Sequence, residues 1–211
     1  MPSDYPDNVI FQNEVLEGQR LELSSKNFRY YLGPNLTLRR CTLILGMPSD
    51  LLHLSGAWFV DCTIEVKKQL KNVCWHKANL KGCRITGRLF SCDFGQTTNP
   101  MAAYHEDVGG IEDCDFTAAH LHACRFAGCD ASTLRFPKWP YFTLLAPSRR
   151  SREIASIMWP REIRSWFTGF GEHHETTAAI TYSAVALAKE AGVSEDRIKA
   201  LLEGHSEIIY F

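Results

Sequence analysis

The stretch that decides the fold is Cys114-Asp-Phe-Thr-Ala, Ala119-His-Leu-His-Ala, Cys124-Arg-Phe-Ala-Gly, Cys129-Asp-Ala-Ser-Thr, Leu134-Arg-Phe136. Each five-residue unit begins with a small or apolar residue and carries a bulky apolar residue two positions later, with Ala131 as the small exception. Helices and strands do not repeat every five residues, because their side chains recur with periods of 3.6 and 2. The repeat therefore indicates a solenoid, in which each unit buries its apolar side chain by stacking on its neighbours.

The same five-residue step extends backwards to Leu23, with one extra residue within 44–51 and another between Ile64 and Leu70. It is lost over residues 95–108, which we expect to form a protruding loop, and it runs again from Ile111 to about Tyr141. The predicted inward positions before this loop are Leu23, Phe28, Leu38, Leu43, Leu54, Phe59, Ile64, Leu70, Trp75, Leu80, Ile85 and Phe90.

The cysteines fit the same register. Cys41, Cys62 and Cys83 are each 21 residues apart, which is about one turn of a four-sided coil plus one bulged residue, so their thiols should stack on one face. No Cys-x-x-Cys pair or zinc-finger spacing is present, and we expect reduced thiols that pack as small apolar groups. The predicted inward cysteines are Cys41, Cys62, Cys83, Cys92, Cys114, Cys124 and Cys129.

The units Cys114-Asp-Phe, Ala119-His-Leu, Cys124-Arg-Phe and Ala78-Asn79-Leu80 resemble the A(D/N)LXX units of pentapeptide-repeat proteins. The resemblance implies a mainly β fold, a right-handed quadrilateral β-helix, here of about five coils. It extends over roughly residues 23–142 and is most regular at 78–94 and 111–136. The family has many roles and no shared catalytic residues, so the resemblance predicts fold more than function.

The two ends of the chain lack the repeat. We expect residues 1–22, which are acidic and irregular, to cap the first coil, and residues 23–142 to form the β-helix. Residues 143–211 should form an α-helical C-terminal domain that covers the far end of the solenoid or mediates a homodimer. Its expected helices are 149–159, 160–167, about 175–191, and 195–203, with Gly192 ending the third and Ser194 capping the last.

Composition places the chain among ordinary globular proteins. It has 211 residues, 45% of them hydrophobic, and a formal net charge of −1, so no global field recruits nucleic acid or an anionic membrane. The first residues have neither a basic region nor an apolar run of the signal-peptide kind, and no apolar segment has the length of a membrane-spanning helix. We therefore expect a cytoplasmic protein.

Few residues suggest chemistry. His120 and His122 flank an inward Leu121 and should share an outward face, but a surface pair is the simpler interpretation than a metal site. Cys74 faces outward beside His76, while His173-His174-Glu175 precedes a predicted helix. Nucleophile-elbow, P-loop and dinucleotide motifs are absent from the sequence. We expect no enzyme activity, no cofactor and no metal; an enzyme with a site at loop 95–108 or at the junction with the helical domain is an alternative.

Charge is distributed unevenly along the repeat. Basic residues dominate 65–90 and acidic residues dominate 93–115, which predicts a bipolar surface, and residues 23–142 carry 14 Lys and Arg against 10 Asp and Glu. A DNA mimic needs dense negative charge, so this balance argues against the topoisomerase (gyrase)-interacting role known among pentapeptide-repeat proteins. The candidate partner-binding residues are Lys67, Lys68, Lys71, Lys77, Lys81, Arg84, Arg88, His105, Glu106, Asp107, Glu112, Asp113 and Asp115.

A rigid surface with patterned charge is suited to selective binding of a protein partner. The sequence therefore predicts a non-catalytic protein-binding scaffold, most concretely a bacterial immunity or inhibitor protein that binds and neutralises a cognate toxin or enzyme. Nucleic acid and membrane are not expected partners. The topoisomerase-interacting DNA mimic is the second hypothesis.

Overall fold

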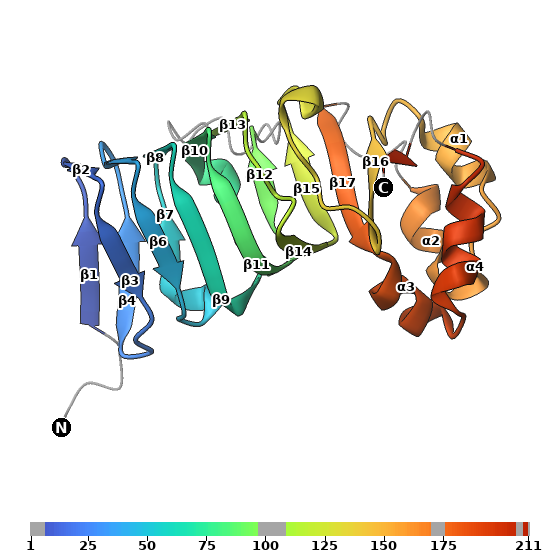
Figure 1. Ribbon diagram of the computed structural model, residues 1–211, viewed down its shortest axis with the longest axis horizontal. Coiled ribbons are helices and arrows are strands. Elements are labelled where there is room, and N and C mark those ends of the chain that lie inside the picture. Colours follow the sequence, from blue (N-terminus) through green and yellow to red (C-terminus); the bar gives the residue numbers. More distant parts are fainter. Residues whose placement is uncertain (1–6, 97–108, 170–175, 206–208, 211) are drawn as a thin grey trace.

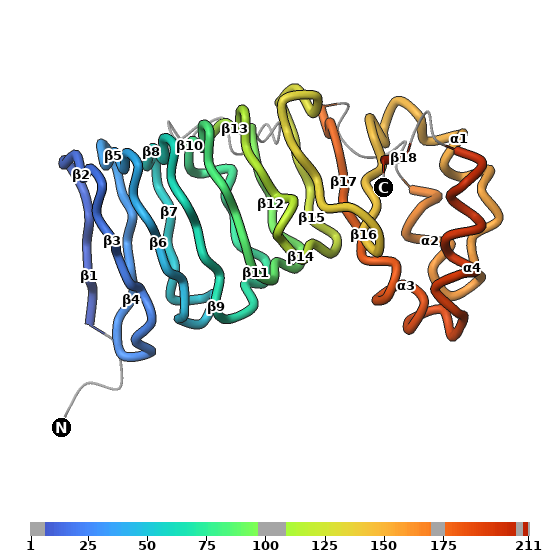
Figure 2. Tube along the Cα trace, viewed as in Figure 1, coloured from blue at the N-terminus to red at the C-terminus, as the bar shows by residue number. Residues whose placement is uncertain are grey.

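The computed structural model describes residues 7–96, 109–169, 176–205 and 209–210. The chain forms an elongated β-solenoid of about four turns, with the N-terminal strands at one end and a group of helices at the other (Figure 1). The coils follow one another along the long axis in sequence order (Figure 2). Among the described residues, no helix combines the length and apolar character needed to cross a bilayer.

Each coil has four faces, numbered in the order in which the chain passes through them, and two sheets of five parallel strands run the length of the solenoid. One of these sheets is the second face, which consists of β2 (Val15–Glu17), β5 (Thr37–Arg39), β8 (Ala57–Val60), β10 (Ala78–Lys81) and β13 (Gly110–Glu112). The other sheet consists of β3 (Arg20–Leu23), β6 (Thr42–Leu45), β9 (Thr63–Lys71), β11 (Arg84–Phe90) and β14 (Ala119–His122). A register shift between Gly87 and Leu89 divides β9 and β11 between a third face (63–66 and 84–87) and a fourth face (70–71 and 88–90) that β14 continues.

The first face has two parts. β1 (Asp7–Phe11), β4 (Phe28–Leu32) and β7 (Leu52–Leu54) form a parallel sheet. The short helical turn η2 (Trp75–Lys77) follows, and an isolated bridge between Cys74 and Asp93 leads on to β12 (Asp93–Gly95) and β15 (Cys124–Ala127). Two further helical turns, η1 (Ser49–Leu51) and η4 (Ala131–Thr133), lie at coil corners.

The core confirms the five-residue register. Leu38, Phe59, Ile64, Phe116 and Leu121 are fully buried, and the rings of Phe59, Trp75, Phe94, Phe126 and Phe136 follow one another at centroid distances of 5.1–6.1 Å. Burying each such side chain contributes about 1.5–3 kcal/mol, so the aromatic column adds substantially to the apolar stabilisation of the solenoid. Two predicted inward positions are wrong: Phe28 is exposed and Phe90 faces outward, because the register shift turns Leu89 into the core instead.

The cysteines also stack as predicted. Cys62 contacts both Cys41 and Cys83, and Cys83 contacts Cys114 in the next coil, which gives one column of thiols. Cys92 and Cys124 form a second pair on another face. Six of the seven cysteines predicted to face inward are buried and Cys129 is half-buried, while Cys74 is exposed. All eight are free thiols.

One corner of the coil lies in the left-handed backbone region. Gly18, Arg40, Asp61, Gly82 and Asp113 all have φ between 50° and 65°. The first four each donate a backbone N–H to the next coil at 2.8–3.0 Å, as in the bond from Arg40 to the Val60 carbonyl. This bonding offsets the cost of about 1–2 kcal/mol that a non-glycine residue incurs in that region. The corner therefore turns sharply without needing glycine in every coil.

Both termini differ from the sequence expectation. Residues 7–22 were expected to cap the first coil, but β1, β2 and β3 pair with β4, β5 and β6 and so form the first coil themselves. Residues 177–183 were expected to be helical, but they form β17 (Thr177–Ser183), which pairs antiparallel with β15 and with β16 (Tyr141–Leu145). Sheet pairing on both sides overrides the helical preference of this alanine-containing segment.

The C-terminal part thus combines a sheet extension with four helices. β17, β16 and β18 (Ile209–Tyr210) continue the first face beyond β15 and cover its edge. The helices are α1 (Ser151–Ser156), α2 (Arg161–Thr168), α3 (Ala184–Ala191) and α4 (Glu195–Leu202). Gly192 ends α3 with φ 63°, and the Ser194 hydroxyl caps α4, as predicted. A second core that includes Phe142, Trp159, Phe167 and Tyr182 holds these elements together.

Candidate functional site

The predicted basic and acidic residues do not form separate ends of the molecule. Lys81 and Glu112 are opposite each other in β10 and β13, with Nζ 3.0 Å from Oε2. Parallel β-bridges pair the backbone of Arg84 with that of Asp115, and the backbone of Asp115 with that of Arg135. The Arg135 Nη2 atom also lies 3.3 Å from Asp115 Oδ2. Glu112 and Asp115 thus each lie beside a basic residue of a neighbouring coil, whereas Asp113 forms no ion pair among the described residues. On the third face, Arg84, Asp115 and Arg135 alternate in charge over the last coils instead of separating into two poles.

The remaining basic candidates lie apart from one another. Lys67 forms an ion pair with Glu65 at 2.7 Å, and Lys68 follows it in the bulge between the third and fourth faces. Lys71 Nζ lies 5.9 Å from the Phe90 ring centre on the fourth face, and Lys77 lies in η2 on the first. The structure therefore does not bring the predicted residues into one patch. Loop residues His105, Glu106 and Asp107, and also His173, lie outside the described residues.

A groove lies where the fourth face meets the helices. It has a volume of about 420 Å³ and is lined by side chains of β11 and β14 on one wall and of α2 and α3 on the other. Arg88, a predicted residue, and Trp166, whose exposed fraction is 39%, belong to opposite walls. The complete lining is Gln69, Arg88, Leu89, Phe90, His120, Leu121, His122, Tyr141, Trp166, Ser183, Ala186, Lys189 and Glu190.

The two histidines of β14 share an outward side, as predicted, but their roles are structural. His120 Nδ1 lies 2.5 Å from the Tyr141 hydroxyl. The His122 ring stacks on Phe90 at 5.4 Å and meets Tyr182 edge-on at 5.9 Å, while its Nδ1 accepts the Ser183 backbone N–H at 3.2 Å. These contacts connect the solenoid to α3, which no local sequence pattern could show because His122 and Ser183 are 61 residues apart.

The groove carries charged and titratable side chains on both walls. Burial lowers the pKa of His122, although Glu190 opposes the shift, so the ring is neutral near pH 7. Among the described residues, no carboxylate forms an ion pair with Arg88, and Lys189 lines the same groove. Glu190 lines the groove as well, so the charged side chains of the groove are two cations and one carboxylate.

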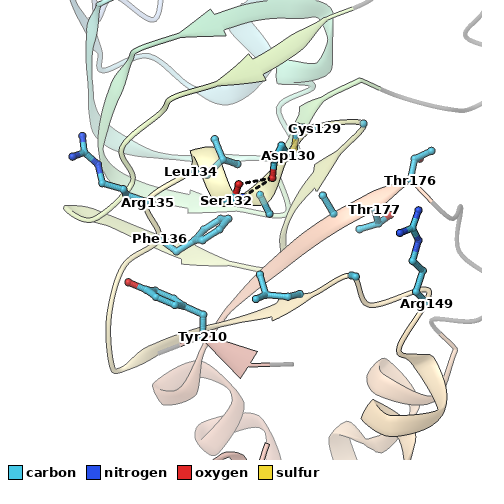
Figure 3. Close-up of a pocket in the computed structure, with 15 residues that line it drawn as sticks. Cys129, Asp130, Ser132, Leu134, Arg135, Phe136, Arg149, Thr176, Thr177 and Tyr210 are labelled. Carbon is cyan, nitrogen blue, oxygen red and sulfur yellow. Dashed lines mark hydrogen bonds between the residues drawn. The ribbon is translucent and has the colours of Figure 1, made fainter. Parts of the chain in front are cut away.

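A second and larger hollow lies between the last coil and the sheet extension (Figure 3). Its volume is about 880 Å³; residues 128–136 form one wall, and β17, β18 and the residues after β16 form the other. Phe136 and Tyr210 face each other across it at 6.4 Å, and Arg135 and Arg149 lie at its rim. The Asp130 carboxylate is held by the backbone and hydroxyl of Ser132 at 2.9 and 2.7 Å. We call this hollow the terminal slot.

The thiols offer little for nucleophilic chemistry. Although Cys74 is exposed as a whole, partial desolvation of its thiol raises its pKa, and the negative charge of Asp93 adds to this shift. Desolvation also lowers the pKa of neighbouring His76. Burial together with Asp130 raises the pKa of Cys129 in the terminal slot to about 11. A reactive cysteine needs the opposite shift. Within the described residues, no group of three or more His, Cys, Asp or Glu side chains is placed to hold a metal ion.

No protein-family model matches the chain, and a search of curated proteins finds no similar sequence.

Proposed function

We propose that this chain is a non-catalytic protein-binding scaffold, most concretely a bacterial immunity or inhibitor protein that binds and neutralises a cognate toxin or enzyme in the cytoplasm. The proposal includes membership of the pentapeptide-repeat family. The four-sided coil and the buried residue of each five-residue unit support that membership.

The observation that carries the proposal is the pairing of Arg88 and Trp166 in the groove. Both side chains are accessible, and they project from elements that are fixed by two packed cores. A rigid surface loses little conformational entropy on binding, so exposed aromatic and guanidinium groups on it can contribute strongly to affinity. An acidic segment of the partner would pair with Arg88 and Lys189 while packing against the indole ring.

The alternating charges of the third face argue against DNA mimicry. The order Arg84, Asp115, Arg135 along the axis places a carboxylate between two guanidinium groups. A surface that imitates the DNA backbone requires successive negative charges that are not neutralised by neighbours. This arrangement favours the protein-binding scaffold over the topoisomerase-interacting alternative.

The test is affinity capture of the partner from the native host, followed by calorimetry with the purified partner. Arg88→Glu and Trp166→Ala should each weaken binding at least ten-fold, because both remove a central contact of the groove. Matched controls are Arg152→Glu, an exposed arginine of α1, and Trp58→Ala, an exposed tryptophan of β8. The controls should bind within two-fold of the wild type.

A second measurement asks whether binding neutralises the partner. Cells that express the partner should grow when they also express the wild-type chain, and should lose this protection with the two groove variants. Recovery of no stoichiometric partner, or full protection by both groove variants with unchanged melting temperatures, would contradict the proposal.

A further inference from the structure

The backbone of the third face follows one hydrogen-bond pattern from coil to coil. Asp115 donates its N–H to the Cys83 carbonyl at 2.8 Å and accepts from the Ile85 N–H at 2.9 Å. Arg135 repeats this in the next coil, donating to the Cys114 carbonyl at 3.0 Å and accepting from the Phe116 N–H at 2.8 Å. Each coil thus offers one carbonyl and one N–H, two residues apart, to the coil that follows.

The pattern stops at the terminal slot. The groups that would serve the next coil are the Leu134 carbonyl and the Phe136 N–H, and among the described residues no backbone group bonds to either. On the first face, in contrast, β17 covers the edge of β15. Leu134, Arg135 and Phe136 all line the slot, so an unpaired parallel edge opens into a cavity of about 880 Å³. Such an edge is a template for another strand.

The side chains specify what that strand should carry. On the outward side, Arg84, Asp115 and Arg135 alternate in charge from coil to coil, and the Arg135 side chain is 70% exposed with Asp115 on one side only. The next outward residue in the series is therefore acidic. Arg149 adds a second cation at the opposite part of the rim. On the inward side, Leu134 and Phe136 are buried, and the Phe136 ring packs against the Tyr210 ring at 6.4 Å.

We propose that the terminal slot binds an extended segment of a partner protein, which adds as a parallel strand to Leu134–Phe136 with an acidic residue opposite Arg135. The N–H of the acidic residue donates to the Leu134 carbonyl, and its carbonyl accepts the Phe136 N–H. Its carboxylate pairs with Arg135. Main-chain bonds supply affinity and the alternating side chains supply selectivity, as in other cases of strand addition. This inference rests on the proposed function only in taking the occupant to be a protein.

The chain itself contains a suitable probe. Residues 110–118 (Gly-Ile-Glu-Asp-Cys-Asp-Phe-Thr-Ala) form the strand segment that pairs with Arg135 from the other side. A synthetic peptide of this sequence, under reducing conditions, is titrated against the full-length protein. Fluorescence anisotropy gives the affinity, and two-dimensional NMR with hydrogen exchange follows the Phe136 amide. We expect saturable binding, a shifted Phe136 signal and slower exchange of its N–H.

A charge exchange makes the test specific. A peptide with lysine in place of its central aspartate (Asp115 in the chain) should bind at least five-fold more weakly to the wild type. Arg135→Glu should reverse this preference, while Arg152→Glu should leave it unchanged. Because Arg135 also pairs with Asp115 within the chain, Arg149→Glu serves as a second variant on the opposite rim and should weaken binding of the original peptide.

Three results would overturn the proposal: no binding at millimolar peptide concentration, equal affinity for the aspartate and lysine peptides, or NMR signal shifts confined to residues outside the slot. Sedimentation of the protein alone is the remaining arm, because self-association that Arg149→Glu abolishes would show that a second copy, not a partner protein, fills the slot. The peptide test does not involve Arg88 or Trp166, so its failure and the failure of the groove variants are separate outcomes.

Discussion

Gly87 in β11 lies so close to Val66 in β9 that a β-carbon on the glycine would fall 2.0 Å from the Val66 carbonyl oxygen. The backbone at Gly87 has φ 92°, a conformation that L side chains rarely adopt. This contact marks the corner where the chain passes from the third to the fourth face, just before the register shift. The corner therefore depends on the absence of a side chain.

Gly87→Ala should lower the free energy of unfolding by about 3 kcal/mol or more, because backbone strain and steric overlap add. The measurement is denaturant unfolding. Gly18→Ala is the matched control: its φ is 61°, but nothing lies within 4 Å of the added carbon, so about 1 kcal/mol is expected. Equal losses in the two variants would contradict the close contact.

Asp115 should make stability depend on acid pH. Burial of its carboxyl opposes ionisation, but hydrogen bonds from the Thr117 hydroxyl and N–H, together with the charges of Arg135 and Arg84, leave its pKa below the ordinary value of 3.8. A carboxyl with a depressed folded pKa stabilises the fold above its unfolded pKa and loses this effect as pH falls through the folded pKa.

Asp115→Asn should therefore lower the free energy of unfolding by about 1–2 kcal/mol at pH 7. The difference in stability between this variant and the wild type should narrow below about pH 4. Thermal unfolding of both proteins between pH 2.5 and 7 measures this difference. A constant difference across the range would show that the ionised carboxylate does not contribute.

His122 should make stability depend on pH closer to neutrality. Because burial lowers its pKa from 6.5, the unfolded chain binds this proton more readily than the folded chain, and stability falls as pH drops below about 6.5. His122→Phe should cost about 1–3 kcal/mol at pH 7.5, since the Ser183 N–H loses its acceptor. The variant should lose less stability than the wild type between pH 7.5 and 5. Parallel pH profiles from chemical denaturation would contradict the buried neutral ring.

The order in which the thiols react should follow their accessibility to solvent. Cys74 is exposed and Cys129 is half-buried with a pKa of about 11, while the hydrogen bond with Cys114 raises the pKa of Cys83 to about 12. Iodoacetamide at pH 7.5 should modify Cys74 first and Cys129 more slowly, and the other six thiols only after unfolding. Mass spectrometry of proteolytic digests measures how much of each cysteine is alkylated at each time. Rapid modification of buried Cys92 would contradict the stacked core.

The sequence predicted the solenoid because its core is periodic. Phe59, Ile64, Phe116 and Phe126 follow a five-residue step that only stacking of coils explains, and the 21-residue spacing of Cys41, Cys62 and Cys83 gave the length of a turn. The prediction failed where this signal weakens. In the first coil the inward residues Leu16 and Leu21 are only partly buried, and at the bulge Leu89 replaces Phe90 in the core.

The candidate sites were accessible from sequence only in part. Arg88, Arg84 and Asp115 were singled out by their charge, but whether they are neutralised depends on which coil lies beside them. Trp166 and the terminal slot gave no signal, because segments far apart in the chain form their surroundings: Gln69 to Glu190 line the groove, and Gly128 to Tyr210 line the slot.

The sequence by itself determined the period of the coil, its apolar and thiol core, the end of α3 at Gly192 and the start of α4 at Ser194, since these depend on side chains a few residues apart. Only the tertiary structure decided that Thr177–Ser183 pairs as a strand over β15, that His122 links the solenoid to α3, and that Leu134 and Phe136 end the hydrogen-bond series at an open slot. The physical reason is that pairing, burial and charge neutralisation between distant segments depend on the coordinates of both partners, whereas a local pattern specifies only one of them.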